Sequence, residues 1–228
     1  MPSMRTFLYL LPTLLLWFAW GPAHALDALR SQEIAQCLPG EVQTWGDGRD
    51  RPALSPQMVF VYDHTGAPAW FDQATVLGAV RRAVSAWSEC GVTGTVVSAA
   101  PGGSTPGAVS VVWSEAGSVG NFGLADLGRK TLSLGPAAFQ LLQTRNPAYD
   151  ARETLQMVIS HEVGHMYGVV AHSRRCVDVT SYYNNGKGEL CSIRGGGAMV
   201  RGVEYRSVLP TACDLQRCRA ANGTTGRP

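Results

Sequence analysis

The chain has 228 residues, of which 45% are hydrophobic, and its formal net charge is +2. This length and apolar content suit a single domain with one substantial core. The basic residues are scattered along the chain, which argues against nucleic acid or an anionic membrane surface as a partner.

The N-terminus has the pattern of a secretory signal peptide. Arg5 precedes an apolar run from Phe7 to Trp20, and small residues follow at positions 23 and 25. We therefore predict a signal peptide over residues 1–25, cleaved after Ala25. An uncleaved membrane anchor is disfavoured because the run is short for a bilayer span, and no neighbouring cysteine could carry a lipid. We expect a secreted or periplasmic protein without a membrane anchor.

The mature chain is expected to form one domain, residues 26–228, that opens with an irregular segment over residues 26–56. Glycines and prolines recur in that segment, and they favour turns over regular structure. Runs rich in β-branched and apolar side chains predict strands over residues 57–62, 93–98, 108–114 and 131–134. These strands indicate a mixed sheet.

Two long helices and a short terminal one are predicted. The first begins after the candidate N-cap Asp72, ends before Gly91, and has an apolar stripe at helical spacing made by Val76, Leu77, Val80, Val84 and Trp87. The second begins near Asp150 to Arg152 and repeats the spacing with Leu155, Val158, Ile159 and Val163. The terminal helix lies within residues 209–223. We assign the side chains of the first stripe to the hydrophobic core rather than to a cofactor site.

All six cysteines follow the predicted cleavage site: Cys37, Cys90, Cys176, Cys191, Cys213 and Cys218. Disulfides are expected in an exported chain, although the sequence does not select their connectivity. Cys176 and Cys191 are plausible local partners. Cys213 and Cys218 are disfavoured as partners, because a helical separation of five residues exceeds the Cα distance that a disulfide tolerates. The alternative of a zinc–thiolate site lacks a Cys-x-x-Cys pair.

The second helix contains the run HEVGH, residues 161–165, which matches the pattern HExxH. Two histidines four positions apart lie on one helix face one turn apart, so His161 and His165 can reach the same metal ion. Glu162 lies about 100° further round the helix, where it can hold a water molecule without ligating the metal. This spacing predicts a zinc site with a general base beside it.

His172 is the candidate third ligand. In a continuous helix it would lie about 16 Å along the axis from His161, too far for one ion. It can therefore act as a ligand only if the helix ends and the chain turns back. Gly168 permits that turn, because glycine adopts the left-handed conformation without a steric penalty.

At this point the chain resembles the metzincin clan of zinc endopeptidases, in particular the matrixin type, whose signature is HExxHxxGxxH. His161, Glu162, His165 and Gly168 match position for position, whereas the next ligand of the clan falls on Ala171 and His172 stands one residue later. Either the turn holds one extra residue and His172 still reaches the zinc, or a more distant group such as Asp178 or Glu189 completes the site.

A second departure lies in the segment CVDVTSYYN, which resembles the Met-turn beneath the metal in this clan. Thr180 occupies the methionine position, and Met199 is a candidate substitute from a later loop. The resemblance also makes Tyr182 a candidate to stabilise the oxyanion, with aromatic packing as the alternative role.

The resemblance implies an α+β fold: a mixed twisted sheet with two long helices, a zinc cleft, an irregular C-terminal lobe and a short terminal helix. It implies a zinc endopeptidase that acts on peptide or protein substrates, and we expect this enzyme to be a secreted monomer. Zn²⁺ would be held by His161, His165 and His172, with Glu162 as the base and Tyr182 as the second catalytic candidate. Peptide is expected to add to a sheet edge at residues 120–127. Two alternatives remain: a secreted binding module with a vestigial or structural zinc site, and an HExxH hydrolase of another clan that uses Glu189 as third ligand.

Overall fold

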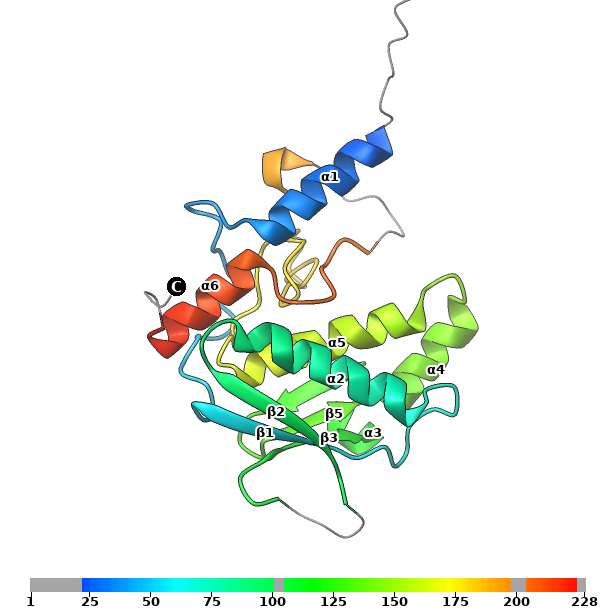
Figure 1. Ribbon diagram of the computed structural model, residues 1–228. Coiled ribbons are helices and arrows are strands. Elements are labelled where there is room, and N and C mark those ends of the chain that lie inside the picture. Colours follow the sequence, from blue (N-terminus) through cyan, green and yellow to red (C-terminus); the bar gives the residue numbers. More distant parts are fainter. Residues whose placement is uncertain (1–21, 101–104, 198–203, 225–228) are drawn as a thin grey trace, which may run out of the picture.

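The computed structural model describes residues 22–100, 105–197 and 204–224 (Figure 1). Residues 1–21, which hold most of the predicted signal peptide, and Met199 lie outside this described part. Within it, no helix is long and apolar enough to cross a membrane.

A five-stranded mixed sheet forms one layer of the fold, with the strand order β2-β1-β3-β5-β4. Its strands are β1 (Gln57–Tyr62), β2 (Thr93–Ser98), β3 (Val109–Trp113), β4 (Gly123–Asp126) and β5 (Thr131–Leu134). β2, β1, β3 and β5 run parallel, whereas β4 pairs with β5 in the antiparallel direction and forms an edge of the sheet. The four predicted strands are confirmed to within a residue at each end, and so is the mixed character of the sheet.

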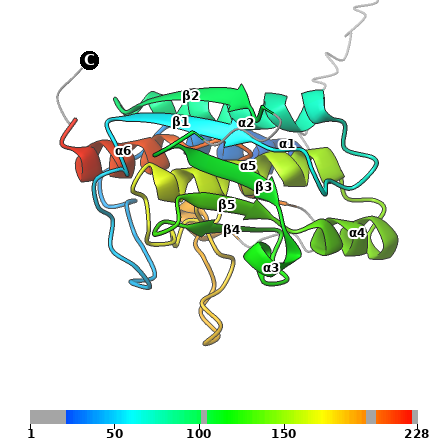
Figure 2. The ribbon, with the colours of Figure 1, turned by 90° about the horizontal axis from the view of Figure 1, so that it is seen from below.

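Two long helices, α2 (Gln73–Ser88) and α5 (Ala151–Met166), lie against the same face of the sheet (Figure 2). The predicted N-cap Asp72 is confirmed, since its side chain accepts from the Thr75 N–H. The predicted start of the second helix is confirmed as well, and Asp150 caps it by accepting from the Arg152 and Glu153 N–H groups. Every residue of the apolar stripe predicted for α2 is buried. The large core lies between these helices and the sheet.

Close packing against α2 fixes the position of α5. The Trp87 indole donates a hydrogen bond of 2.8 Å to the Ser160 carbonyl, immediately before His161. A Cβ at Gly164 would lie 2.5 Å from Cζ2 of the same indole, so only glycine fits there. The amide of Gln156 donates to the Ala79 carbonyl. The histidine-bearing turns of α5 therefore have a defined height and rotation relative to the sheet.

Helix α1 (Pro22–Ala35) corrects the expectation that residues 26–56 are wholly irregular. Polar contacts hold this helix: Arg30 donates to the carbonyls of Tyr205 and Arg206, and the buried Glu33 accepts from the Tyr205 hydroxyl and the Arg194 N–H. Hydrophobic periodicity does not reveal a helix of this kind. The predicted cleavage point after Ala25 falls within α1.

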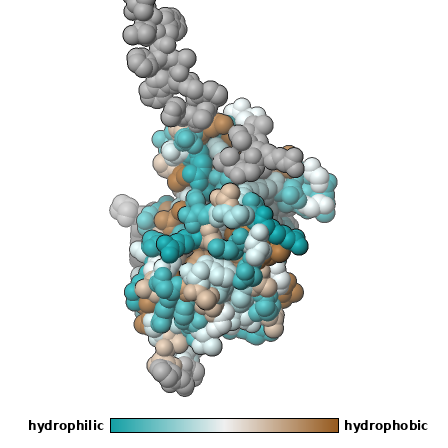
Figure 3. Space-filling model, turned by 90° about the vertical axis from the view of Figure 1, so that its right-hand side faces the viewer, coloured by the Kyte–Doolittle hydropathy of each residue, from teal (hydrophilic) through white to brown (hydrophobic). Residues whose placement is uncertain are grey.

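Three further helices complete the described part: α3 (Glu115–Ser118), α4 (Pro136–Arg145) and α6 (Ala212–Asn222), together with the 3₁₀ turn η1 (Arg194–Gly196). α6 confirms the predicted terminal helix and ends at Gly223 in the left-handed conformation. The surface in Figure 3 shows apolar residues scattered among hydrophilic ones.

The six cysteines form three disulfides: Cys37–Cys213 joins the segment after α1 to α6, Cys90–Cys218 joins the end of α2 to α6, and Cys176–Cys191 closes a local loop. The expected local pair Cys176–Cys191 is confirmed, and Cys213 and Cys218 pair with distant partners rather than with each other. Disulfides of this kind fit a chain that folds in an oxidising compartment.

Candidate metal centre

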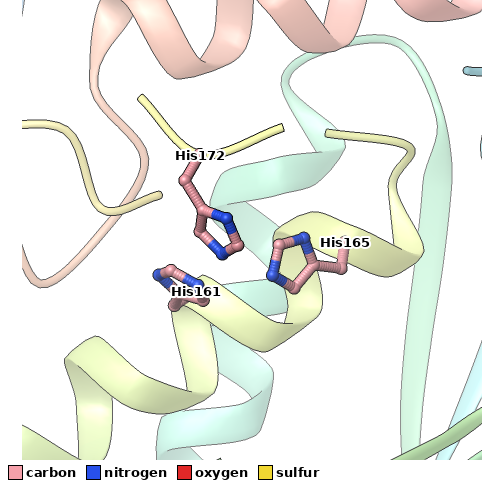
Figure 4. A group of neighbouring side chains, drawn as sticks. All are labelled: His161, His165 and His172. Carbon is pink, nitrogen blue, oxygen red and sulfur yellow. The ribbon is translucent and has the colours of Figure 1, made fainter. Parts of the chain in front are cut away.

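Three imidazoles converge beside the C-terminal half of α5 (Figure 4). One ligand atom from each of His161, His165 and His172 lies within 4.8 Å of the others. The ring centroids are 4.9 Å apart for His161 and His165, and 5.1 Å from each of these to His172. The structure thus brings together all three histidines that the sequence singled out.

The turn after α5 is a Schellman motif, which reverses the chain toward the helix. The Gly168 N–H bonds the His165 carbonyl and the Val169 N–H bonds the Gly164 carbonyl. Gly168 has φ +96, and a Cβ there would overlap the Arg51 carbonyl oxygen. Glycine is therefore required at this position for two separate reasons, backbone conformation and close approach.

Contacts from distant segments then hold the residues after Gly168 in place. Asp50 accepts hydrogen bonds from the Val170 and Ala171 N–H groups, and Arg217 donates to the Ala171 carbonyl while it pairs with Asp50. Ala171 is buried at 3% exposure, so its side chain turns inward. The next residue, His172, then points its ring at the other two.

Each imidazole uses Nδ1 for a protein acceptor. The Nδ1 atoms lie 2.8 Å from the Val179 carbonyl for His161, 2.8 Å from the Val169 carbonyl for His165, and 2.7 Å from Asp47 Oδ2 for His172. Metal-ligating histidines commonly engage the second ring nitrogen in this way, which leaves Nε2 free for the ion. Nε2 of His172 is buried without a hydrogen-bond partner in the described residues, an arrangement that a bound metal would satisfy.

The environment favours the neutral form of these rings. Burial, followed by the neighbouring imidazoles, holds the pKa of His161 well below its usual value. Burial lowers the pKa of His165 to about 4 and also lowers the pKa of His172, whose partner Asp47 opposes the shift. Neutral imidazole is the form that ligates a metal, so the site is prepared for a cation. A donor set of three imidazoles fits zinc with one position left open.

Glu162 lies beside the histidines and faces β4. It is 8% exposed, and burial raises its pKa to about 7, with the Ala125 N–H opposing the shift. Gly123 makes room for it, because a Cβ there would lie 2.6 Å from Val158 Cγ1 and 2.8 Å from Glu162 Cγ. The carboxyl group is thus held between α5 and the edge strand. Sequence spacing identified Glu162 but did not identify Gly123.

We expect Gly123→Ala to destabilise the fold, because its added methyl group overlaps side chains that α5 holds in place. Overpacking of this kind costs about 1–3 kcal/mol. Urea unfolding of the variant should show that loss, whereas Gly128→Ala, with no contact closer than 3.4 Å at its Cβ, should differ little from the parent. Equal stability of the two variants would contradict the close contact between β4 and Glu162.

Tyr182 stacks on the exposed side of the site. Its ring centroid is 3.7 Å from that of His172, with an angle of 17° between the planes, and 45% of the residue is exposed. This contact is an aromatic packing role, while the oxyanion role stays a prediction. Tyr182 also lines the cleft described below.

Thr180 is buried and hydrogen-bonded, where the resemblance implied a methionine. Its hydroxyl donates to Asp214 and accepts from Arg217, and Asp214 also accepts from the Val179 N–H. Val179 is the residue whose carbonyl holds His161. A polar network therefore supports the segment beneath the histidines, and α6 supplies it.

The alternative third ligands lie elsewhere. The Asp178 carboxylate is buried and accepts from Ser173, Arg175 and Thr211. Glu189 is exposed and accepts from the Asn185 amide. Among the described residues, the group that contains His161 and His165 includes His172 and no carboxylate.

A cleft of about 690 Å³ runs past the three histidines. Its lining includes the edge strand β4 with its flanking residues, and apolar side chains of α4 and α5 that include Leu142, Met157 and Val158. Tyr183, Glu204 and Arg206 close another side. The cleft is therefore bounded on the β4 side by an edge strand of the sheet.

No protein-family model matches this chain, and no curated protein matches its sequence. A chain of a solved structure entitled "GM1 bound form of the ECX AB5 holotoxin" is similar to it with a TM-score of 0.45 and 14% sequence identity. The match covers 82% of this chain and 92% of that chain. A likeness of this size carries no argument about function.

Proposed function

We propose that this protein is an exported zinc endopeptidase that hydrolyses peptide bonds in a cleft along β4. The observation that carries the proposal is the convergence of three Nδ1-anchored imidazoles beside a buried carboxyl group. His161, His165 and His172 would hold Zn²⁺, and the metal would supply Lewis acidity and a water molecule with a lowered pKa. The metzincin-like character of the fold belongs to this proposal.

Glu162 is the proton carrier in the proposed reaction. A pKa near 7 suits a group that first accepts a proton from the attacking water and then gives it to the leaving amine. The carboxyl group is enclosed by Val158, Gly123 and the Ala125 N–H, so its position is fixed before substrate arrives. Preorganisation of this kind avoids reorientation during the reaction.

The edge strand β4 is the proposed substrate platform. An extended peptide can pair with the outer edge of Gly123–Asp126 by strand addition, which aligns its backbone along the cleft. Tyr182 lies over His172 at the opposite side, and we propose it as the group that contacts the oxygen of the scissile carbonyl. The apolar end of the cleft, lined by Leu142 and Met157, favours an apolar side chain.

Metal removal tests the proposal. The mature chain is expected to bind one zinc ion per molecule and to hydrolyse casein, to lose that activity on dialysis against a chelator, and to regain it when zinc is restored. Elemental analysis and release of acid-soluble peptides measure the two properties. Zinc bound without hydrolysis of any member of a peptide library would instead favour a binding module, and absence of zinc binding would reject the proposal.

A further inference from the structure

Asp47 makes two contacts with His172 although 125 positions separate the two residues in the chain. Asp47 Oδ1 accepts from the His172 backbone N–H at 3.0 Å, and Oδ2 lies 2.7 Å from Nδ1 of the same residue. One carboxylate therefore fixes both the backbone and the ring of the third candidate ligand. His161 and His165, by contrast, each rely on a backbone carbonyl.

The segment around Asp47 is built against the loop that carries His172. The Trp45 N–H donates to the His172 carbonyl at 3.0 Å, and Thr44 pairs with Ser173 in an isolated antiparallel bridge. Gly46 has φ +70, and a Cβ at Gly48 would lie 3.1 Å from Val170. The two glycines around Asp47 thus let the segment turn and approach the loop closely.

His172 needs this support more than the other two histidines do. His161 and His165 belong to α5, where backbone geometry and packing against α2 restrict their rings. His172 lies in a loop, and the side chain of Asp47 is the described group that engages its Nδ1. A carboxylate that accepts from Nδ1–H assigns the ring lone pair to Nε2 and increases its basicity as a ligand.

We propose that Asp47 is a positioning residue of the metal centre, which orients His172 and makes Nε2 the ligand atom, so that zinc affinity depends on its carboxylate. This inference rests on the zinc site proposed above. It adds the N-terminal segment, which is tethered at Cys37 to α6 by a disulfide, to the parts of the chain that build the site. Asp47 lines the same cleft, and in this proposal its carboxylate acts on the metal through the His172 ring.

The test compares zinc affinities of the mature chain with those of Asp47→Ala and Asp47→Asn. Competition with a chromophoric chelator at pH 7 gives the Kd for zinc, and the absorption spectrum of the cobalt-substituted protein reports the ligand geometry. We expect affinity to fall about 10- to 100-fold in Asp47→Ala, the loss typical of an outer-shell partner. The zinc affinity of Asp47→Asn should lie between those of the parent and Asp47→Ala, because the amide retains one acceptor oxygen but not the charge.

Asp63→Ala is the matched control. Asp63 also caps a turn, by accepting from the Thr65 N–H, but it lies outside the residues that surround the histidines. The control should bind zinc like the parent and leave the cobalt spectrum unchanged. Urea unfolding of each metal-free variant separates loss of the fold from loss of the ligand orientation.

Two results would overturn the inference. If Asp47→Ala and Asp47→Asn bind zinc as tightly as the parent, Asp47 does not position the ligand, while the zinc site itself stands. The same follows if zinc affinity falls only in proportion to a loss of stability of the metal-free variant, and the cobalt spectrum of the folded fraction equals that of the parent. If the parent chain binds no zinc, the proposed function fails together with the inference.

Discussion

Replacing Glu162 with glutamine is expected to abolish peptide hydrolysis and to leave zinc binding intact. The amide is nearly isosteric with the carboxyl group but cannot accept a proton from water, and general acid–base catalysis contributes about 10²- to 10⁴-fold. The carboxyl group is buried, with its pKa raised to about 7, so removal of its charge should not weaken the fold. Hydrolysis of a fluorogenic peptide library and zinc content measure the two properties.

Glu153→Gln serves as the control for this variant, because it makes the same chemical change on the exposed first turn of the same helix. It should retain parental activity. Full activity in Glu162→Gln would reject the proposed role of Glu162. Loss of zinc together with activity would instead show that Glu162 supports the ligands.

The second large effect is expected at Gly168. Gly168→Ala forces an L side chain into φ +96 and places its Cβ against the Arg51 carbonyl oxygen. The backbone strain alone costs about 1–3 kcal/mol, and the overlap adds to it, because a backbone atom cannot move aside as a flexible side chain can. The turn should open and withdraw His172, so we expect both the free energy of unfolding and zinc affinity to fall.

Gly186→Ala separates the two causes. Gly186 also has a left-handed φ, +69, but no atom lies within 4 Å of a Cβ placed there. This control should show the conformational cost alone and retain its zinc. Parental zinc affinity in Gly168→Ala, measured by chelator competition, would contradict the role of the chain reversal in forming the site.

Local sequence signals predicted those elements whose stability depends on local features. α2 and α5 have apolar stripes and aspartate caps at Asp72 and Asp150, and the strands have runs of β-branched residues, so periodicity and capping revealed them. Periodicity and capping did not predict α1 or α4. α1 is held by Arg30 and Glu33 through polar contacts with the chain near Tyr205, and α4 buries only Phe139 among its residues.

In the candidate site, too, some residues are placed by local geometry and others by long-range contacts. HExxH spacing on a helix brings His161, Glu162 and His165 together by local geometry alone. The position of His172 depends on Asp47, Asp50 and Arg217, which come from segments far away in the chain. The spacing of residues in the sequence does not predict those contacts.

The sequence also did not predict how the segment around Thr180, beneath the histidines, is held. The absence of methionine at position 180 indicated only that something differed there. The structure places the Thr180 hydroxyl between Asp214 and Arg217, and both of these residues belong to α6. Long-range polar pairing of this kind becomes visible only when the tertiary fold is known.

Anomalous X-ray scattering at the zinc absorption edge, from a crystal of the mature protein, tests the central claim most directly. We predict one peak at bonding distance, about 2.0–2.1 Å, from a ring nitrogen of each of His161, His165 and His172. A peak bound by His161 and His165 with a carboxylate as third ligand would contradict the claim. So would a zinc-soaked crystal without a peak, in which α5 continues past Gly168 and His172 points into solvent.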